Sequence, residues 1–358
     1  MLTIKKYYDF DDVLIKPSLS EIDSRQSIDM TLNLDLSITA ALSKDYLDGW
    51  KPIPILSANM DTITGVDLAF ELVKKNWIAV LHKYVSISEI TALFDKIDLY
   101  NKTRTSEKDH IDYRNIFISR GTSSKDQIKL QERLESESRI KSVCIDVANG
   151  HRRSILTYVE NLRKSLCKDK ILMVGNIASS EMFKMYQDIN IDLIKIGIGP
   201  GSACTTRIKT GVGVPQISLI DECRAVATSS LVVSDGGCKV SGDISKAFVA
   251  GAHFVMIGGM LAGTRETPGE METINGRTVK RFSGMAAKES QQNGVPTYGV
   301  EEGKTVFIPY RGKVSHILSD IEGGIRSTCT YTGALSISKL FQAELILTNV
   351  QENKIFSS

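Results

Sequence analysis

The feature that most constrains the fold of this chain is a short apolar run, rich in Val and Ile, that recurs along its length and ends on a polar residue or a glycine. Eight such runs occur, near positions 55, 78, 116, 143, 172, 194, 232 and 255, with the sequences PILSANMD, WIAVLHK, NIFISRG, SVCIDVANG, ILMVGNI, LIKIGIG, LVVSDGG and FVMIGGM. Segments with helical spacing and good helix formers lie between most of them, at 65–76, 86–98, 124–136, 152–166, 179–190 and 240–252. Strands without in-and-out alternation that are joined by helices predict a parallel sheet covered on both faces.

Eight strand–helix units in a chain of 358 residues predict an α/β fold, a (β/α)8 TIM barrel that forms a single catalytic domain over residues 1–358. A doubly wound open sheet has the same local pattern and remains the alternative. Polar residues follow the ends of the apolar runs, which are the positions at which a barrel gathers its active site. These residues are Asn59, Asp61, His82, Lys83, Asp146, Asn149, Asn176 and Asp235.

Residues 264–312 interrupt this rhythm. The segment is polar and follows the last apolar run, so we expect it on the catalytic face of the barrel. A long insertion at this place predicts a flap, or lid, within the barrel domain.

The overall charge excludes some classes of partner. The chain has 44 Lys and Arg against 42 Asp and Glu, a net charge of +2, so we expect no nucleic-acid partner and no attraction to an anionic membrane. No apolar run reaches the roughly 18 residues of a membrane span, and the first residues lack the apolar core of a signal peptide. The prediction is a soluble, cytoplasmic protein that binds any phosphate through a local site.

The six cysteines are scattered along the chain. They form no CxxC pair and have no His at metal-ligand spacing, which argues against a zinc site and against a disulfide framework. We expect six free thiols, of which all but Cys204 are inert.

Cys204 differs from the others because it stands in the glycine-rich stretch GIGPGSACTTRIKTGVGVPQ, at 197–216, directly after the sixth apolar run. This composition predicts an irregular loop that is neither helix nor strand. A single cysteine is by default a small buried hydrophobic residue. Here the flanking glycines leave the sulfur accessible, backbone amides can stabilise a thiolate, and the hydroxyl of Thr206 follows two residues later, so we predict a reactive thiol.

Two glycine pairs end the last two apolar runs, Gly236–Gly237 and Gly258–Gly259. Glycine lets backbone N–H groups approach phosphate oxygens closely, and the loops after the seventh and eighth strands of barrels commonly hold phosphate. Glycine also serves tight turns, so each pair alone is weak evidence. Asp235 could accept hydrogen bonds from a ribose diol, or it could be a helix N-cap or a turn residue.

The remaining candidates are less specific. Asp146 and Lys83 end apolar runs at the expected catalytic mouth, where a charged residue is often functional, although each could equally be half of a salt bridge. His151 and His253 fall in or beside expected helices, and we interpret them as surface or packing residues.

Taken together, the cysteine loop and the motifs ILSANMDT, CIDVANGH, VSDGGC, FVMIGGMLAG and GGIRSTCTYTGA resemble the IMP dehydrogenase and GMP reductase family over essentially the whole chain. The resemblance implies that Cys204 attacks C2 of a purine nucleotide and forms a covalent thioimidate. It also implies a bound monovalent cation, potassium, near Gly199, Gly201, Cys204 and Arg207.

The reductase branch of the family is the more similar one. The chain passes from LHKY directly into SISEI, which leaves no room for the CBS regulatory domain that dehydrogenases usually carry after the second strand. The motifs EEGKTV, IRSTCTYTGA and VQENKIF also look like reductases. The resemblance therefore implies NADPH-dependent conversion of GMP to IMP with release of ammonia, in purine nucleotide salvage, by a homotetramer.

The resemblance also implies a role for individual residues. Glu302 and Thr206 would form the proton-transfer pair beside the nucleophile. The residues that would hold GMP are Asp235, Gly236, Gly237, Gly258, Gly259, Gly284, Met285, Ala286 and Gly303. Those that would face the cofactor are Ser24, Arg25, Lys83, Asp146, Val147, Ala148, Ile198, Gly199, Tyr298, Ser327, Thr328, Cys329 and Thr330.

The flap departs from the reductase pattern. Tyr298 is followed by Gly299 where reductases usually have Tyr-Arg, the flap is a few residues shorter, and GMAAKES replaces a run that has two more hydroxyls. Three alternatives therefore stay open: a dehydrogenase-type oxidation of IMP, a relative that acts on a modified or deoxy guanine nucleotide, and a non-catalytic nucleotide-binding protein. Retention of Cys204, Thr206 and Glu302 argues against the last of these.

Overall fold

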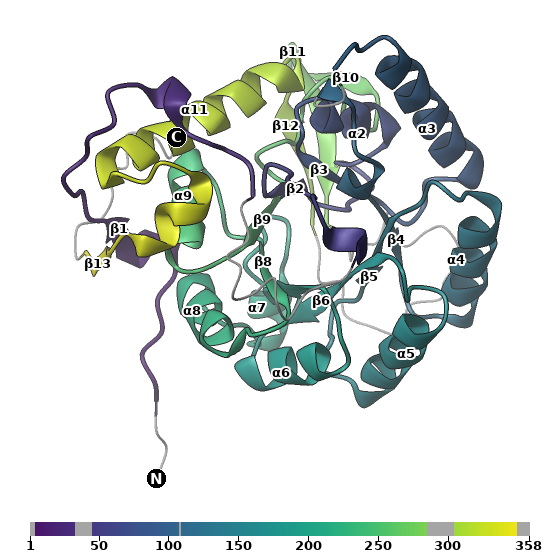
Figure 1. Cartoon of the computed structure of the whole chain (residues 1–358), viewed down its shortest axis with the longest axis horizontal. Coiled ribbons are helices and arrows are strands. Elements are labelled where there is room, and N and C mark those ends of the chain that lie inside the picture. The colour runs from purple at the N-terminus through teal and green to yellow at the C-terminus, as the bar shows by residue number, and fades with distance from the viewer. Residues whose placement is uncertain (1–3, 33–44, 107–108, 285–303, 349–358) are drawn as a thin grey trace.

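The centre of the molecule is a closed barrel of eight parallel strands (Figure 1), seen in a computed structural model that describes residues 4–32, 45–106, 109–284 and 304–348. The strands follow chain order around the barrel: β2 (Ile55–Ser57), β3 (Ile78–Leu81), β4 (Ile116–Arg120), β5 (Ser142–Asp146), β6 (Ile171–Ile177), β7 (Leu193–Ile196), β8 (Leu231–Asp235) and β9 (Phe254–Ile257). Closure is direct, since Leu56 of β2 pairs with Met256 of β9. The predicted (β/α)8 barrel is confirmed, and the open sheet is excluded because its first and last strands would not pair.

Helices surround the barrel (Figure 1): α2 (Val66–Val73), α3 (Ile87–Lys102), α4 (Ser124–Ser136), α5 (Arg153–Lys164), α6 (Ser180–Asp188), α7 (Thr206–Thr210), α8 (Gln216–Val226), α9 (Ser241–Val249) and α11 (Val314–Thr332). All six expected helices are present. Serine caps set several of their starts: Ser86 accepts the N–H of Glu89 at the start of α3, and the Glu89 carboxylate accepts the N–H of Ser86 in return. Helices α7, α8 and α11 were not among those expected, and none of the described helices is long and apolar enough to cross a membrane.

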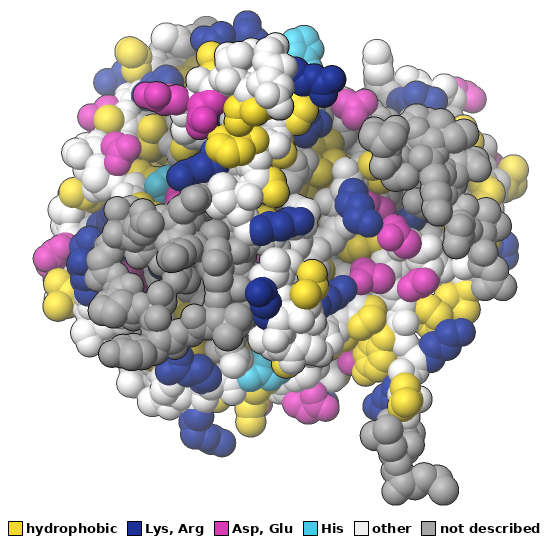
Figure 2. Space-filling view, turned by 180° about the vertical axis from the view of Figure 1, so that it is seen from behind, with side chains coloured by type: hydrophobic (Ala, Val, Ile, Leu, Met, Phe, Trp, Pro, Cys, Tyr) yellow, Lys and Arg dark blue, Asp and Glu magenta, His cyan; other side chains and the backbone are white. Residues whose placement is uncertain are grey.

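Short 3-10 helices complete the connections: η1 (Phe10–Asp12), η2 (Arg25–Ser27), η3 (Asp45–Leu47), η5 (Tyr113–Asn115) and η6 (Ile337–Gln342). The two ends of the described chain meet in an antiparallel pair, β1 (Val13–Ile15) with β13 (Leu345–Leu347), beside α9 and α11 (Figure 1). Acidic and basic side chains are interspersed over the face seen in Figure 2, in keeping with the balanced charge.

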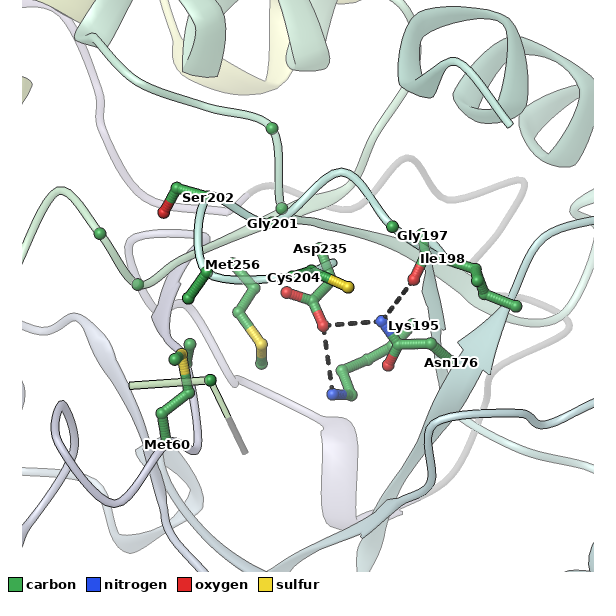
Figure 3. A pocket seen from close by; sticks show the side chains of 18 of the residues that line it. Met60, Asn176, Lys195, Gly197, Ile198, Gly201, Ser202, Cys204, Asp235 and Met256 are labelled. Atoms are coloured by element: carbon green, nitrogen blue, oxygen red, sulfur yellow. Dashed lines mark hydrogen bonds and ion pairs between the residues drawn. The ribbon is translucent and has the colours of Figure 1, made fainter. Parts of the chain in front are cut away.

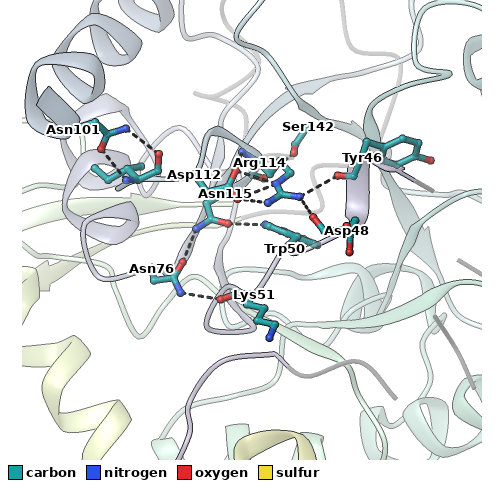
Figure 4. Close-up of polar contacts among 11 residues, drawn as sticks. Tyr46, Asp48, Trp50, Lys51, Asn76, Asn101, Asp112, Arg114, Asn115 and Ser142 are labelled. Carbon is teal, nitrogen blue, oxygen red and sulfur yellow. Dashed lines mark hydrogen bonds and ion pairs between the residues drawn. The ribbon is translucent and has the colours of Figure 1, made fainter. Parts of the chain in front are cut away.

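The amino end of the barrel is closed by Trp50, which precedes β2 (Figure 4). Its ring stacks on Phe254 with centroids 5.6 Å apart, and its indole N–H donates to Asn115 Oδ1 at 2.7 Å. Asn115 in turn donates to Asn76 Oδ1 at 2.9 Å, so this buried amide is satisfied on both sides. Among the described residues, buried side chains fill this end of the barrel, and the cavity described below lies at the carboxyl ends of the strands.

The segment expected to form the flap contains a three-stranded antiparallel sheet that the sequence did not reveal, made of β10 (Met271–Ile274), β11 (Arg277–Ser283) and β12 (Thr305–Pro309). Lys280 of β11 anchors it, because its buried amine donates to the carbonyls of Thr264 and Thr267. Residues 285–303 lie outside the described part of the chain. A lid role for 264–312, and its place within one catalytic domain, stay predictions.

Candidate active site

A cavity of about 260 Å³ opens at the carboxyl ends of the barrel strands (Figure 3). It brings together many of the residues singled out from the sequence: Asp146, Val147, Ala148, Ile198, Gly199, Gly201, Cys204, Thr206, Asp235, Gly236, Gly237, Gly258, Gly259 and Gly284. Residues far apart in the sequence thus share one wall, as the polar strand ends predicted.

The thiol of Cys204 lies on the wall of this cavity (Figure 3). Its Sγ donates a hydrogen bond to Thr206 Oγ1 at 3.2 Å, and its backbone N–H donates to the carbonyl of Gly201 at 3.0 Å. The expectation that 197–216 is wholly irregular was wrong, because Thr206 opens the short helix α7. That helix stops at Gly211, whose φ of 71° is the left-handed conformation that glycine adopts readily.

Arg207 explains part of the glycine content of this loop. Its side chain passes so close to Gly199 and Gly213 that a Cβ on either would lie 2.5 or 2.7 Å from Arg207 Cγ. The guanidinium then bonds to Asp9 Oδ2 at 3.2 Å and to the carbonyl of Val214 at 2.6 Å. Two of the glycines therefore make room for a side chain that fastens the cysteine loop to the N-terminal segment.

The glycine pairs are also places of close approach. Gly236 and Gly237 have φ of 92° and 93°, and a Cβ on Gly237 would lie 2.8 Å from the ring of Phe10. A Cβ on Gly259 would lie 2.9 Å from Ser202 Oγ in the cysteine loop. Packing alone thus accounts for glycine at these positions, while their backbones still line the cavity as a phosphate site would require.

A charged array lies at the base of the cavity, and its central residue, Lys195, was not among the residues predicted from the sequence. The amine of Lys195, on β7, lies 2.6 Å from Asp146 Oδ1 and 3.3 Å from Asp235 Oδ2. Asn176 Nδ2 donates to the same Asp235 oxygen at 2.9 Å and to the carbonyl of Gly197 at 2.8 Å (Figure 3). The signal that could have revealed Lys195 is a lone charge inside the apolar run LIKIGIG.

The electrostatics of this array keep the lysine charged. Burial by itself opposes the ammonium form of Lys195, but the carboxylates of Asp146 and Asp235 outweigh it and raise the pKa above that of a free lysine. The salt-bridge interpretation of Asp146 is thus confirmed, although the partner is Lys195 and the carboxylate still borders the cavity.

Apolar side chains also line the cavity. Met60, Met256 and Phe282 were not singled out from the sequence, and they form a surface suited to a flat heterocycle. A second cavity of about 420 Å³, lined mainly by apolar residues such as Val212 and Val214, adjoins the first. Ala148, Ile198 and Thr206 line both cavities, so the second lies on the side of the first where Thr206 stands.

Several residues assigned to the cofactor by resemblance lie elsewhere. Lys83 does not line either cavity, and its amine is 5.2 Å from the ring centroid of Tyr84. Ser24 and Arg25 lie at the start of η2, which contacts α11, the helix that contains residues 327–330. Arg326 of α11 donates to the carbonyl of Arg25 at 3.1 Å. Cys329 in that segment is fully buried, so its side chain contacts only protein.

The other predicted site residues, Met285, Ala286, Tyr298, Glu302 and Gly303, together with Gly299, lie outside the described residues. The structure does describe Gly284 and Lys304, the residues on either side of this segment. The N–H of Gly284 donates to the carbonyl of Lys304, and the N–H of Lys304 donates to the carbonyl of Ala203. The two ends of this segment therefore meet beside the cysteine loop.

The other thiols are neutral at ordinary pH. All six cysteines are free, and burial raises the pKa of Cys144, Cys167 and Cys223 to about 12. Burial likewise raises the pKa of Cys238 and Cys329. This agrees with the expectation that they are unreactive, although Cys238 borders the cavity.

The two histidines singled out in the sequence, His151 and His253, each accept a hydrogen bond from a backbone N–H. His151 Nε2 accepts the N–H of Ala178 at 2.9 Å, and His253 Nδ1 accepts the N–H of Val232 at 2.9 Å. Neither is hydrogen-bonded to the thiol. His253 is partly buried and His151 lies at the surface, where it also lines the second cavity.

Comparison with known proteins agrees with this site. Residues 7–354 match the family model described as IMP dehydrogenase / GMP reductase domain. GMP reductase of Shewanella halifaxensis is 36% identical over 353 residues, which cover 97% of this chain and 96% of the relative. GMP reductase 2 of Bos taurus and that of Homo sapiens are each 39% identical over 355 residues, which cover 98% of this chain and 96% of the relative. The closed barrel has a cysteine on the cavity wall in its sixth strand-to-helix connection, and the matches extend over almost the whole chain, so the chain belongs to the IMP dehydrogenase / GMP reductase family.

Proposed function

We propose that this protein is a GMP reductase, which converts GMP and NADPH to IMP, ammonia and NADP+. The observation that carries the proposal is the Cys204–Thr206 pair, 3.2 Å apart, on the wall of a cavity that two glycine pairs and three large apolar side chains also line. The names of the relatives support the choice of reaction.

The cavity offers a partner for each part of a purine nucleotide. The backbone N–H groups of Gly236, Gly237, Gly258 and Gly259 would bind the phosphate, and Asp235 would accept hydrogen bonds from the ribose diol. The apolar surface of Met60 and Met256 would hold the base so that C2 meets the sulfur of Cys204.

The chemistry would proceed through the bond between sulfur and C2. Cys204 loses its proton and attacks C2 of the guanine ring; the amino group then takes up a proton and leaves as ammonia, and the sulfur stays bound in a thioimidate. Thr206, together with Glu302, would move these protons. A bound nicotinamide would supply the hydride that C2 accepts; cleavage of the C–S bond would then return the thiolate of Cys204 and release IMP.

The residues around the thiol fit a nicotinamide cofactor. Ala148 and Ile198 line both the cavity that holds the thiol and the second cavity, so a nicotinamide ring bound on this side would lie next to C2. Asp146 and Val147 border the same side. These residues would orient the ring and exclude water, which would otherwise compete at C2.

Potassium and a homotetramer complete the proposal. Gly199 and Gly201 have no side chain to shield their carbonyls, as a loop that coordinates a monovalent cation through backbone oxygens requires. Tyr331, Leu335 and Phe341 are 66%, 66% and 47% exposed around the end of α11, and association would bury this apolar surface. A cytoplasmic location follows from the requirement for NADPH and nucleotide, and it belongs to the proposal as well.

The test is a steady-state assay of purified protein with GMP and NADPH. We expect oxidation of the nicotinamide with release of one ammonia per IMP formed. Turnover of IMP with NAD+, and none of GMP, would instead identify a dehydrogenase. A panel of guanine nucleotides ranked by kcat/KM tests the second alternative, since a preference for a deoxy or modified nucleotide would replace GMP as the substrate. Binding of nucleotide with no turnover of any of them would identify the third, a non-catalytic binding protein.

A further inference from the structure

The four consecutive strands β5 to β8 each direct one polar side chain to the same point below the cavity. Asp146 ends β5, Asn176 lies in β6, Lys195 lies in β7 and Asp235 ends β8. Figure 3 shows Lys195 and Asn176 reaching the Asp235 carboxylate from below and from the side. Lys195 therefore links Asp146, at the end of β5, to Asp235, at the end of β8.

Burial separates the roles of its members. The Lys195 side chain is 1% exposed, whereas those of Asp146 and Asp235 are 28% and 19% exposed. The two carboxylates thus reach the cavity, and the ammonium lies beneath them. Lys195 also lines the base of the cavity, but its side chain is almost fully buried, so its influence on a ligand passes mainly through the two carboxylates that it holds.

The backbone of β6 is shaped around this lysine. A Cβ on Gly175 would lie 2.4 Å from Lys195 Cβ and 2.6 Å from its carbonyl oxygen. Glycine at this position lets β7 pass close to β6 with its long side chain directed into the barrel. Gly175 thus leaves the room that the Lys195 side chain needs.

The charges around the ammonium are two carboxylates against one cation. The titratable groups that face Lys195 are Asp146 and Cys144 from β5 and Asp235 from β8, while β6 contributes the neutral Asn176. Burial raises the pKa of Cys144 to about 12, so this thiol adds no charge at neutral pH. Without the ammonium, two carboxylates would face each other with no cation between them, which is electrostatically unfavourable.

We infer that Lys195 is a positioning residue that holds Asp146 and Asp235 in one ionised array and thereby sets the acid limit of nucleotide binding and turnover. The inference deepens the proposed function, on which its activity readout rests. Asp235 serves the nucleotide and Asp146 the cofactor side in that function, so a single buried cation maintains both subsites.

The test compares Lys195→Gln, which removes the charge, with Lys195→Arg, which retains it. The matched control is Lys246→Met, which removes another buried lysine whose amine donates to the carbonyl of Phe10 at 3.0 Å, outside the cavity. For each protein, kcat/KM for GMP and the Kd for IMP are measured across the pH range from acid to alkaline.

We expect the acid limb of both profiles to move to higher pH in Lys195→Gln by at least about one pH unit, because a nearby opposite charge typically shifts a carboxyl by 1–3 units. At a fixed pH on the acid limb, a displacement of one unit corresponds to a loss of about tenfold. Lys195→Arg and Lys246→Met should keep the wild-type limb. A Lys195→Gln profile that is lowered equally at every pH would overturn the inference, because a purely structural role would have that effect.

If Lys195→Gln folds poorly, its thermal stability still tests the inference. Adding Asp146→Asn to Lys195→Gln removes the repulsion, so the double variant should melt at a higher temperature than Lys195→Gln alone. If the double variant is no more stable, packing rather than charge is what Lys195 supplies, and the inference fails.

A ligand-free measurement separates this inference from the proposed function. The difference in unfolding free energy between wild type and Lys195→Gln should shrink as the pH falls, since protonated carboxylates no longer need the cation. Absence of GMP turnover by the wild type would refute the proposed function alone. A stability difference that is independent of pH would refute the role of Lys195 alone.

Discussion

The thiol of Cys204 donates a hydrogen bond to the hydroxyl oxygen of Thr206 over 3.2 Å. The two groups meet because Cys204 closes a turn on the carbonyl of Gly201 and Thr206 opens helix α7 two residues later. A hydroxyl at this distance can relay the proton that the sulfur must lose and that the departing amine must gain. The pair therefore combines a nucleophile and a proton carrier in one short segment.

Cys204→Ala should abolish turnover of GMP while IMP still binds, because the sulfur forms the bond to C2 and the rest of the cavity holds the nucleotide.

Thr206→Ala should lower kcat about 100-fold or more, within the usual range of acid–base catalysis. Thr206→Ser keeps the hydroxyl and is the control. Rates and calorimetric Kd values check both predictions, and equal kcat for the Ala and Ser variants would contradict the role of Thr206.

Gly237→Ala should destabilise the protein by about 1–3 kcal/mol and raise KM for GMP, because its φ of 93° disfavours a side chain and its Cβ would lie 2.8 Å from Phe10. Gly242→Ala is a matched control: it has no positive φ and nothing within 4 Å of the new Cβ. Its stability should stay within about 1 kcal/mol of the wild type or rise slightly. Denaturant unfolding and steady-state kinetics separate the two variants.

Asn115→Ala should cost about 1–3 kcal/mol of stability and leave kcat unchanged, because it leaves the indole N–H of Trp50 buried without its 2.7 Å acceptor at the far end of the barrel. Adding Trp50→Phe removes that N–H. We therefore expect the double variant to lose less than the sum of the two single changes. Full additivity in urea unfolding would show that the hydrogen bond contributes nothing beyond packing.

The stability of the protein should fall in acid partly through His253. Burial, together with the charge of Arg224, lowers the pKa of His253 to about 3, whereas an unfolded histidine titrates near 6.5. The unfolded chain then binds the extra proton first, so this contribution is complete above about pH 6.5 and is lost as the pH falls toward 3.

Between about pH 7 and 5 we expect the wild type to lose about 1–2 kcal/mol more than His253→Asn, which retains an acceptor for the N–H of Val232 but does not titrate. Urea unfolding at the two pH values measures this difference. Equal losses in both proteins would show that another group controls the acid limb.

The barrel and the position of the thiol followed from local sequence patterns. Continuous apolar runs such as WIAVLHK can be satisfied only by burial on both faces, and their number and the helices between them favour closure. The accessibility of Cys204 followed from its glycine-rich surroundings. Both conclusions depend on a residue and its near neighbours in sequence, which is why they could be reached without the fold.

Other features needed contacts between distant segments. The stretch around Thr206 has too much glycine to predict a helix, yet α7 forms because Arg207 is fastened to Asp9, almost two hundred residues earlier in the chain. The sheet of β10 to β12 depends in part on pairing between β11 and β12, whose paired residues, such as Val279 and Pro309, are far apart in the sequence. Helix α11 does have helical spacing, in Val314, Leu318, Ile321 and Ile325, but it was not among the predicted helices.

What the sequence by itself determined is the alternation of strand and helix and the exposure of one cysteine, because each is a property of short segments and their burial. The tertiary structure alone decided that Lys195 lies beneath Asp146 and Asp235. That arrangement depends on the inward side chain of one strand meeting the ends of strands on either side of it, and on Gly175 leaving room for the lysine. A single charge in an apolar run indicates that a partner must exist, but only the closed barrel shows which carboxylates it serves.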